Sequence, residues 1–449
     1  MDTIKTFESV NSSTLSEADY ASFLVNGQLA EGHQLPNEFI KYKLEDFSPR
    51  IEASNSSDIL IDKLWSTLEE TVTQAYEGRN IILPLSGGYD SACLLGLLLK
   101  RKSGQIFCFS FDSRETRPGS DADIAKKQAE KMEVEHRTFF FEDHSLLDII
   151  RANAAAGPCL RDVSYEIHAY KKAFEYAEKK FENPIALFGD EAMGWVSMKL
   201  QSNNDVLGSI GLRSSKALSK LNVLSDAHKH TLIHALDRSY ESIIESSEHI
   251  SNNDCKKDFL YQKVRLPYNL LPLRKQITGP IIPYAMPLLD KQALNVIEEC
   301  GVEERLDKSL YVKMLNRKLP AIFSIPRTNQ SQATLNVRQK LIDEASSIKT
   351  FILEQKLCVP NLLSNEQLVS WLSQLLSDND EELKKGSKSA LKPIFRSKIV
   401  EILNGRFVPR ILTTKLRQRL YNPFNSGPDE YTMFLRALVM AITWDRQIE

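Results

Sequence analysis

The chain has 449 residues, of which 42% are hydrophobic and 26% are charged, and its formal net charge is −2. The length allows a large core and several domains, whereas the near-neutral charge removes any electrostatic reason to expect a nucleic-acid or membrane-surface partner. No apolar run approaches the roughly 20 residues that span a bilayer. The first residues include acids and lack an apolar stretch, so we expect a cytoplasmic protein.

The six cysteines are scattered, with no CxxC pair and no cluster with histidine. This spacing predicts neither a disulfide framework nor a structural zinc site. Cys93 and Cys108 lie in apolar runs, so we expect them to be reduced core residues.

The first regular element in chain order is a helix. Residues 1–57 are mixed and polar and are predicted to form a small N-terminal appendage. From residue 58 onward, Leu60, Leu64, Leu68 and Val72 follow each other at four-residue intervals, which is typical of the apolar face of a helix.

Short apolar runs then alternate with longer amphipathic segments up to residue 200. Strands are expected at residues 80–85, 105–111, 135–141 and 184–190, and helices at residues 91–101, 120–133 and 163–181. This alternation predicts βαβ units and an α/β fold, with a parallel sheet flanked by helices. Ligands of such sheets bind at the carboxyl ends of the strands. Residues 58–200 are therefore the expected ligand-binding core.

The strand signals disappear beyond residue 200. We expect a helical insertion at residues 201–260, a helical continuation at 261–330 and a mainly α-helical C-terminal region at 331–449. The segment from Lys384 to Arg419 is rich in lysine and arginine. It is either a solvated basic face or a docking surface for an acidic partner.

The sequence "LSGGYDS", from Leu85 to Ser91, joins the first strand to its helix. Its glycines permit positive φ and a close approach of the backbone to a ligand. The first N–H groups of the following helix lack intrahelical partners and favour an anion. Because Asp90 would repel a bare phosphate, it indicates a shared Mg²⁺ ion. A simple turn with an N-cap acid is the alternative, but it does not explain two serines, two glycines and an acid together.

The chain contains neither GxxxxGK[ST] nor GxGxxG, but its SGGxDS pattern resembles the loop of the PP-loop ATP pyrophosphatase superfamily. Three more segments resemble the synthetase domain of asparagine synthetases: "LFGDEAMGW" at 187–195, "IPYAMPLLDKQAL" at 282–294 and "DKSLYVKMLNRKLP" at 307–320. The resemblance covers about residues 58–330. It implies a five-stranded parallel sheet of the PP-loop type, cleavage of ATP between its α- and β-phosphates, and adenylation of a carboxylate.

The resemblance also implies roles for the matching residues. The lysine at 308 would stabilise the phosphates as the α–β bond breaks, and Glu191 is a second catalytic candidate. Structural alternatives stay open: Lys308 could be a surface lysine, Asp190 a helix cap and Ser110 a buried strand residue. Nothing in the sequence marks a histidine as a base, whether His136, His144 or His168. The residues expected to bind ATP are Leu85, Ser86, Gly87, Gly88, Asp90, Ser91 and Ser110, and those expected to bind Mg²⁺ are Asp90 and Asp190.

Two departures from the asparagine synthetases narrow the expected reaction. The chain begins Met-Asp, not with a cysteine after the initiator methionine, and too few residues precede the loop for a glutaminase domain. We therefore expect that glutamine is not the nitrogen donor. Leu187 stands three residues before Asp190, where relatives often carry an acid, and this argues against asparagine as the product.

The sequence predicts an ATP-dependent, AMP-forming carbon–nitrogen ligase that joins a carboxylate to an amine of a small molecule or peptide. Such a reaction fits natural-product or peptide tailoring, as in relatives resembling β-lactam synthetases and lasso-peptide cyclases, with a partner protein or a dimer as further expected partners. One alternative is a tRNA-modifying PP-loop ligase that uses the basic segment to bind RNA. The other is a non-catalytic nucleotide-binding scaffold.

Overall fold

The computed structural model describes residues 15–30, 47–101, 104–112, 118–141, 144–156, 162–190, 200–325, 336–384, 424 and 427–445. The central element is a five-stranded sheet in which every pair of neighbours is parallel, which confirms the predicted fold class. The strands are β1 (Asn80–Pro84), β2 (Ile106–Asp112), β3 (Glu135–Phe140), β4 (Pro184–Leu187) and β5 (Tyr284–Ala285).

The strand order β3-β2-β1-β4-β5 places β1 at the centre of the sheet. Ile82 pairs with Phe107 of β2 on one side and with Ala186 of β4 on the other. The chain runs from β1 outward to β3 and then returns to the other side of β1. The carboxyl ends of β1 and β4 therefore flank a topological switch point, where sheets of this kind bind ligands.

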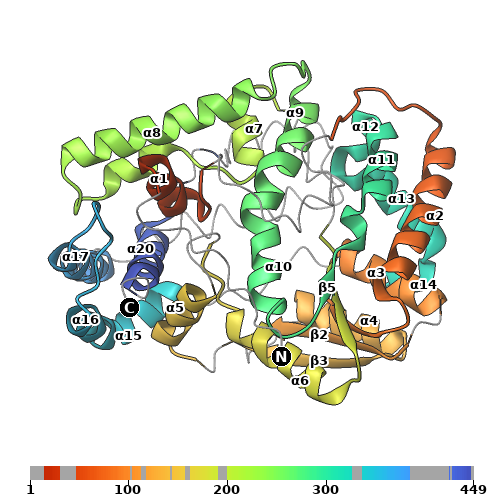
Figure 1. Ribbon diagram of the computed structural model, residues 1–449, viewed down its shortest axis with the longest axis horizontal. Helices are drawn as coiled ribbons and strands as arrows, with labels where there is room; N and C mark the ends of the chain where they lie inside the picture. Colours follow the sequence, from red (N-terminus) through yellow and green to blue (C-terminus); the bar gives the residue numbers. More distant parts are fainter. Residues whose placement is uncertain are drawn as a thin grey trace, which may run out of the picture.

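Helices cover both faces of the sheet (Figure 1). The crossover helices α3 (Tyr89–Lys100) and α4 (Asp121–Lys131) lie on one face, as the right-handed crossover rule requires, and α6 (Ile167–Lys180) lies on the other. The predicted apolar stripe of α2 (Ser57–Tyr76) is confirmed, since all four of its residues are buried. Further helices around this core are α11 (Lys291–Glu299), α12 (Val302–Arg305), α13 (Ser309–Lys318) and α14 (Pro320–Phe323), with short 3₁₀ turns at Pro287–Leu289 and Leu306–Lys308.

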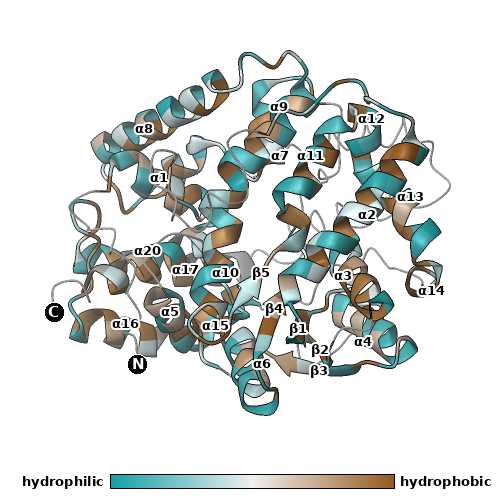
Figure 2. Cartoon of the chain, turned by 45° about the vertical axis from the view of Figure 1, so that its right-hand side comes forward, coloured by the Kyte–Doolittle hydropathy of each residue, from teal (hydrophilic) through white to brown (hydrophobic). Residues whose placement is uncertain are grey.

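A second hydrophobic core is built from helices and the loops that connect them. Its first helix, α1 (Glu17–Asn26), packs against α8 (Asp226–Glu245) and α20 (Glu430–Asp445). α8 has both hydrophobic and hydrophilic residues around its axis, as α2 has in the core around the sheet (Figure 2). The remaining members are α5 (Leu146–Ala155), α7 (Asn203–Ser209), a 3₁₀ helix (Ser215–Lys220), α15 (Val337–Asp343), α16 (Ala345–Glu354) and α17 (Asn365–Lys384).

One helical run joins the two cores. It comprises α9 (Asn253–Leu260), a π-helix (Tyr261–Leu270) and α10 (Leu271–Thr278), and it crosses the middle of the molecule (Figure 1). Val264 belongs to the helical core, whereas Leu271 belongs to the core around the sheet. The run therefore fixes α10 beside the sheet, where α10 packs on α6.

Two further predictions concern the burial of cysteines and the absence of membrane-spanning segments. Cys93 and Cys108 are buried free thiols, which confirms their assignment to the core. Among the described helices, none has the length and apolar character that a bilayer crossing needs.

Candidate nucleotide-binding and active site

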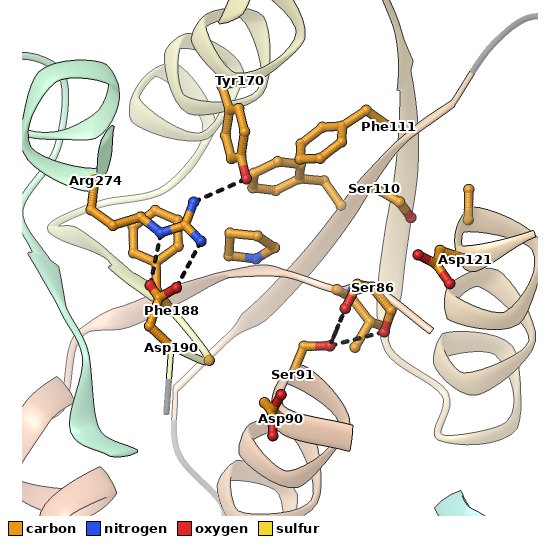
Figure 3. A pocket seen from close by; sticks show the side chains of 15 residues that line it. Ser86, Asp90, Ser91, Ser110, Phe111, Asp121, Tyr170, Phe188, Asp190 and Arg274 are labelled. Atoms are coloured by element: carbon orange, nitrogen blue, oxygen red, sulfur yellow. Dashed lines mark hydrogen bonds and ion pairs between the residues drawn. The ribbon is translucent and has the colours of Figure 1, made fainter. Parts of the chain in front are cut away.

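A cavity of about 230 Å³ opens at the carboxyl ends of β1, β2 and β4 (Figure 3). The first turns of α3 and α4 border it, and side chains from α6 and α10 reach into it. The cavity thus lies at the switch point of the sheet. Its described lining residues are Pro84, Leu85, Ser86, Asp90, Ser91, Phe109, Ser110, Phe111, Asp121, Ala122, Tyr170, Phe188, Gly189, Asp190 and Arg274.

The predicted loop closes onto the first turn of α3 through its two serines. The Ser91 hydroxyl donates to the carbonyl oxygen of Ser86 (2.9 Å) and accepts from the backbone N–H of Ser86 (3.1 Å). The two hydroxyl oxygens lie 3.1 Å apart, and the Ser86 hydroxyl accepts from the N–H of Gly88 at 3.3 Å. A phosphate oxygen that takes the Gly88 N–H would therefore replace the Ser86 hydroxyl as its acceptor.

The loop needs its glycines for space and does not use the positive φ that they permit. Neither Gly87 nor Gly88 has a positive φ, and Gly88 is extended at φ −76° and ψ 167°. A Cβ atom on Gly87 would lie 2.9 Å from the Cβ of Ile124. Sequence reasoning passed over Gly189, where a Cβ would lie 2.9 Å from the backbone nitrogen of Ser91. Only a glycine lets the end of β4 come this close to α3.

Lys308 reaches the loop from a distant part of the chain. Its Nζ lies 3.0 and 3.2 Å from the two carboxylate oxygens of Asp90, a residue 218 positions away. Asp307 and Lys308 have φ of 53° and 55°. This left-handed conformation is energetically unfavourable for any residue other than glycine. This strained corner precedes α13, and it directs Lys308 toward the loop.

Asp190 follows β4 and is held by an arginine that the sequence did not single out. Nε and Nη2 of Arg274 donate to the two oxygens of Asp190 at 2.8 and 3.0 Å, and Nη1 donates to the Tyr170 hydroxyl at 3.2 Å. The guanidinium carbon also lies 4.5 Å from the centre of the Phe188 ring. Burial alone would lower the pKa of Arg274, but Asp190 and Tyr170 raise it above its ordinary value. The guanidinium is therefore a permanent positive charge.

Residues 63–158 match the asparagine synthase family model. The matched stretch begins within α2, includes all of α5, and contains the Ser86–Ser91 loop together with β1, β2 and β3. The match is to a family of ATP-dependent amide-forming synthetases, and the matched stretch is similar to their synthetase domain. No curated protein matches the chain.

Within the matched stretch, Ser110 lines the cavity at the end of β2, and its hydroxyl lies 2.5 Å from Nε2 of His136 on β3. Burial, with a smaller contribution from Lys126, lowers the pKa of His136 from 6.5 to about 4. The imidazole is therefore neutral at pH 7 and holds the Ser110 hydroxyl beside the cavity. Nothing in the sequence indicated this pair.

The low pKa of His136 predicts an acid-sensitive stability. The unfolded chain takes up this proton near pH 6.5 and the folded chain only near pH 4, so stability should fall as the pH decreases between these values. Over this pH interval we expect the free energy of unfolding to fall by an amount on the order of 2 kcal/mol. Urea unfolding at several pH values measures it. His136→Gln keeps a hydrogen-bonding group beside Ser110 without titrating, and an unchanged pH dependence in this variant would contradict the assignment.

Asp90 and Asp190, the predicted Mg²⁺ ligands, both line the cavity. Within the described ranges no group of three or more Asp, Glu, His or Cys side chains is arranged to hold a metal ion. This donor set nevertheless fits Mg²⁺, which in nucleotide sites takes one or two carboxylates and completes its shell with phosphate oxygens and water. Glu191 and the basic segment beyond Lys384 lie outside the described residues.

Proposed function

We propose that the protein is an ATP-dependent, AMP-forming carbon–nitrogen ligase that adenylates a substrate carboxylate and passes the acyl group to an amine. The observation that carries the proposal is that the Ser86–Ser91 loop and Asp190 meet at one cavity at the switch point of the sheet, while Lys308 pairs with Asp90 of the loop. These residues come from three separate parts of the chain. Their convergence supports a single site for the phosphates of ATP.

The proposed reaction has two steps. A carboxylate oxygen of the substrate attacks the α-phosphorus of ATP, the bond between the α-phosphorus and its bridging oxygen breaks, and pyrophosphate leaves with the electron pair. An amine nitrogen then attacks the acyl carbon, AMP leaves, and the nitrogen loses a proton. The N–H groups of the Ser86–Ser91 loop and the ammonium of Lys308 would stabilise the charge on the departing pyrophosphate.

The charges of the cavity support a divalent cation as part of the substrate complex. The described lining contains three carboxylates, those of Asp90, Asp121 and Asp190, and one cation, Arg274. A bare triphosphate would be repelled by such a lining. Asp90 and Asp190 would hold Mg²⁺, which supplies the positive charge that lets the triphosphate enter and that offsets the charge developing on pyrophosphate.

We infer that the amine belongs to a substrate or peptide and does not come from glutamine. Leu187, at the position where asparagine synthetases often have an acid, is completely buried in β4. It offers no group that accepts a proton from ammonia. This supports amide formation between larger molecules, as in the tailoring of peptides or natural products.

The proposal is tested by ATP–[³²P]pyrophosphate exchange with a panel of free amino acids, N-acyl amino acids and short peptides as carboxylates. Hydroxylamine serves as a surrogate amine, and the nucleotide product is identified by chromatography. We expect carboxylate-dependent exchange and formation of AMP together with a hydroxamate. Formation of ADP and phosphate would contradict the AMP-forming reaction. ATP binding without exchange for any carboxylate would favour a nucleotide-binding scaffold.

The substitution Gly189→Ala should weaken ATP binding. Its Cβ would lie 2.9 Å from the nitrogen of Ser91 and 3.0 Å from the carbonyl carbon of Asp90, and backbone atoms cannot move aside as a side chain can. We expect a loss of about 1–3 kcal/mol in unfolding free energy and at least about tenfold weaker Mg–ATP binding by calorimetry. Gly78→Ala is the control, because Gly78 has φ 74° and is far from the cavity lining. It should lose stability but keep its ATP affinity. Normal ATP binding by Gly189→Ala would show that the close approach is not needed.

A further inference from the structure

Arg274 is not one of the site residues predicted from the sequence. Among the described residues that line the cavity, however, it has the only cationic side chain. It extends from α10 into the cavity on the side opposite Asp121 (Figure 3). Its side chain is 15% exposed and that of Asp190 is 8% exposed. A nearly buried guanidinium in a nucleotide cavity requires an explanation beyond packing.

We propose that Arg274 exchanges partners during the reaction. Before the nucleotide binds, it holds Asp190; when a divalent cation takes Asp190, Arg274 binds the α-phosphate oxyanion that ATP and the acyl-adenylate share. This inference rests on the proposed ligase function and adds to it a residue that binds the reacting phosphate.

The first support is competition for Asp190. Both carboxylate oxygens accept hydrogen bonds from Arg274, at 2.8 and 3.0 Å. A metal ion that binds Asp190 must therefore weaken this ion pair. Lys308 engages both oxygens of Asp90 in the same way, so each of the two predicted metal ligands is neutralised by a cation before metal arrives.

The second support is the remaining binding capacity of the guanidinium. An arginine has five N–H groups, and its contacts with Asp190 and Tyr170 use three of them. Two N–H groups are left for an oxyanion even before Asp190 moves, and four are available once it has left. The planar fork of arginine matches the geometry of phosphate oxygens.

The third support is that Arg274 keeps its place when Asp190 leaves. The guanidinium lies 4.5 Å from the centre of the Phe188 ring and 3.2 Å from the Tyr170 hydroxyl, and neither contact involves Asp190. Stacking on an aromatic face stabilises an arginine without fixing its hydrogen-bond partners. The charge would thus remain at the cavity wall while its anionic partner changes.

The location favours the α-phosphate over the terminal phosphates. The Ser86–Ser91 loop and the N-terminus of α3 offer N–H groups to the pyrophosphate portion, and the end of β2 offers Ser110 and Phe111 to the nucleoside. The α-phosphate lies between these two portions of ATP. Arg274 stands on the β4 side of the same cavity and donates to Tyr170, whose ring centre lies 4.4 Å from that of Phe111. These contacts direct its guanidinium toward the space between the loop and the nucleoside end.

The test compares the wild-type chain with Arg274→Gln, Arg274→Lys and the control Lys275→Gln. Lys275 is the next residue of α10 and does not line the cavity, so its substitution removes a charge from the same helix without changing the lining. Three affinities are measured: Mn²⁺ without nucleotide by electron paramagnetic resonance, and adenosine and AMP at saturating Mn²⁺ by calorimetry. For Arg274→Gln we expect Mn²⁺ to bind about threefold to fivefold more tightly, because its competitor is gone. AMP should bind about tenfold more weakly while adenosine is unchanged. Arg274→Lys should be intermediate, and Lys275→Gln should behave as the wild type.

Weaker Mn²⁺ binding by Arg274→Gln would overturn the proposal, since it would mean that Arg274 only positions Asp190. Equal losses for AMP and adenosine, or an unchanged AMP affinity, would overturn the assignment to the α-phosphate. If the wild type binds no adenine nucleotide, the proposed function falls as well. If the wild type exchanges pyrophosphate normally but Arg274→Gln does not show the expected changes in Mn²⁺ and AMP affinity, only the proposed role of Arg274 is contradicted.

Discussion

Lys308→Ala is expected to lower the rate of ATP–pyrophosphate exchange at least about a hundredfold, the usual effect of removing one positioned group that stabilises a developing oxyanion. The Ser86–Ser91 loop contains no lysine, and Lys308 brings its ammonium to 3.0 Å from Asp90 within it. The left-handed backbone at Asp307 and Lys308 indicates that this placement has an energetic cost. The effect should fall mainly on the rate constant, because the charge on pyrophosphate increases as the bond breaks.

The matched control for Lys308 is Lys313→Ala. Lys313 is an exposed residue of α13, the helix that follows Lys308, so its loss changes the net charge equally without touching the cavity. Lys308→Arg keeps the charge and should retain more activity than the alanine variant. Exchange at the wild-type rate by Lys308→Ala would show that Lys308 is a surface lysine with no catalytic role.

Asp90→Asn should also abolish exchange, with a loss of at least about a hundredfold, through the metal and not through the fold. The amide has nearly the same shape as the carboxylate and can still accept a hydrogen bond from Lys308. It lacks the negative charge that Mg²⁺ requires from its few protein ligands. The variant should therefore fold normally by circular dichroism and bind Mn²⁺ more weakly than the wild type.

Asp121→Asn provides the control for charge in this experiment. Asp121 lines the same cavity, and its substitution changes the charge of the lining by the same amount. It removes no predicted metal ligand, so a much smaller effect on exchange is expected. If the two variants lose activity equally, the role of Asp90 is general electrostatics and not metal binding.

Much of the fold was predictable because the signals are local. A buried strand such as β1 reads as a continuous apolar run, and Ile81, Ile82 and Leu83 are all completely buried. The resemblance implied a fifth strand, which the structure confirms, but the sequence did not locate it. Tyr284–Ala285 is too short to show any periodicity, and it lies among prolines. α1 was read as part of an appendage, although Ser16 and Asp19 form a capping box, because its burial depends on α8 and α20, far along the chain.

The candidate site was predictable only where a motif carries it. The Ser86–Ser91 loop and Lys308 lie in recognisable segments, and the structure brings them together. Arg274 and Tyr170 are ordinary helix residues in the sequence, and their direction is set by the packing of α10 on α6. The need for Gly189 follows from a contact with Ser91, which no local pattern reveals.

A crystal structure with ATP and Mg²⁺ tests the central claim most directly. We expect the terminal phosphates at the N–H groups of Gly87 and Gly88, with one Mg²⁺ ion contacted by Asp90 and Asp190. A triphosphate bound away from the Ser86–Ser91 loop, or carboxylates of Asp90 and Asp190 too far apart to share an ion, would contradict the account.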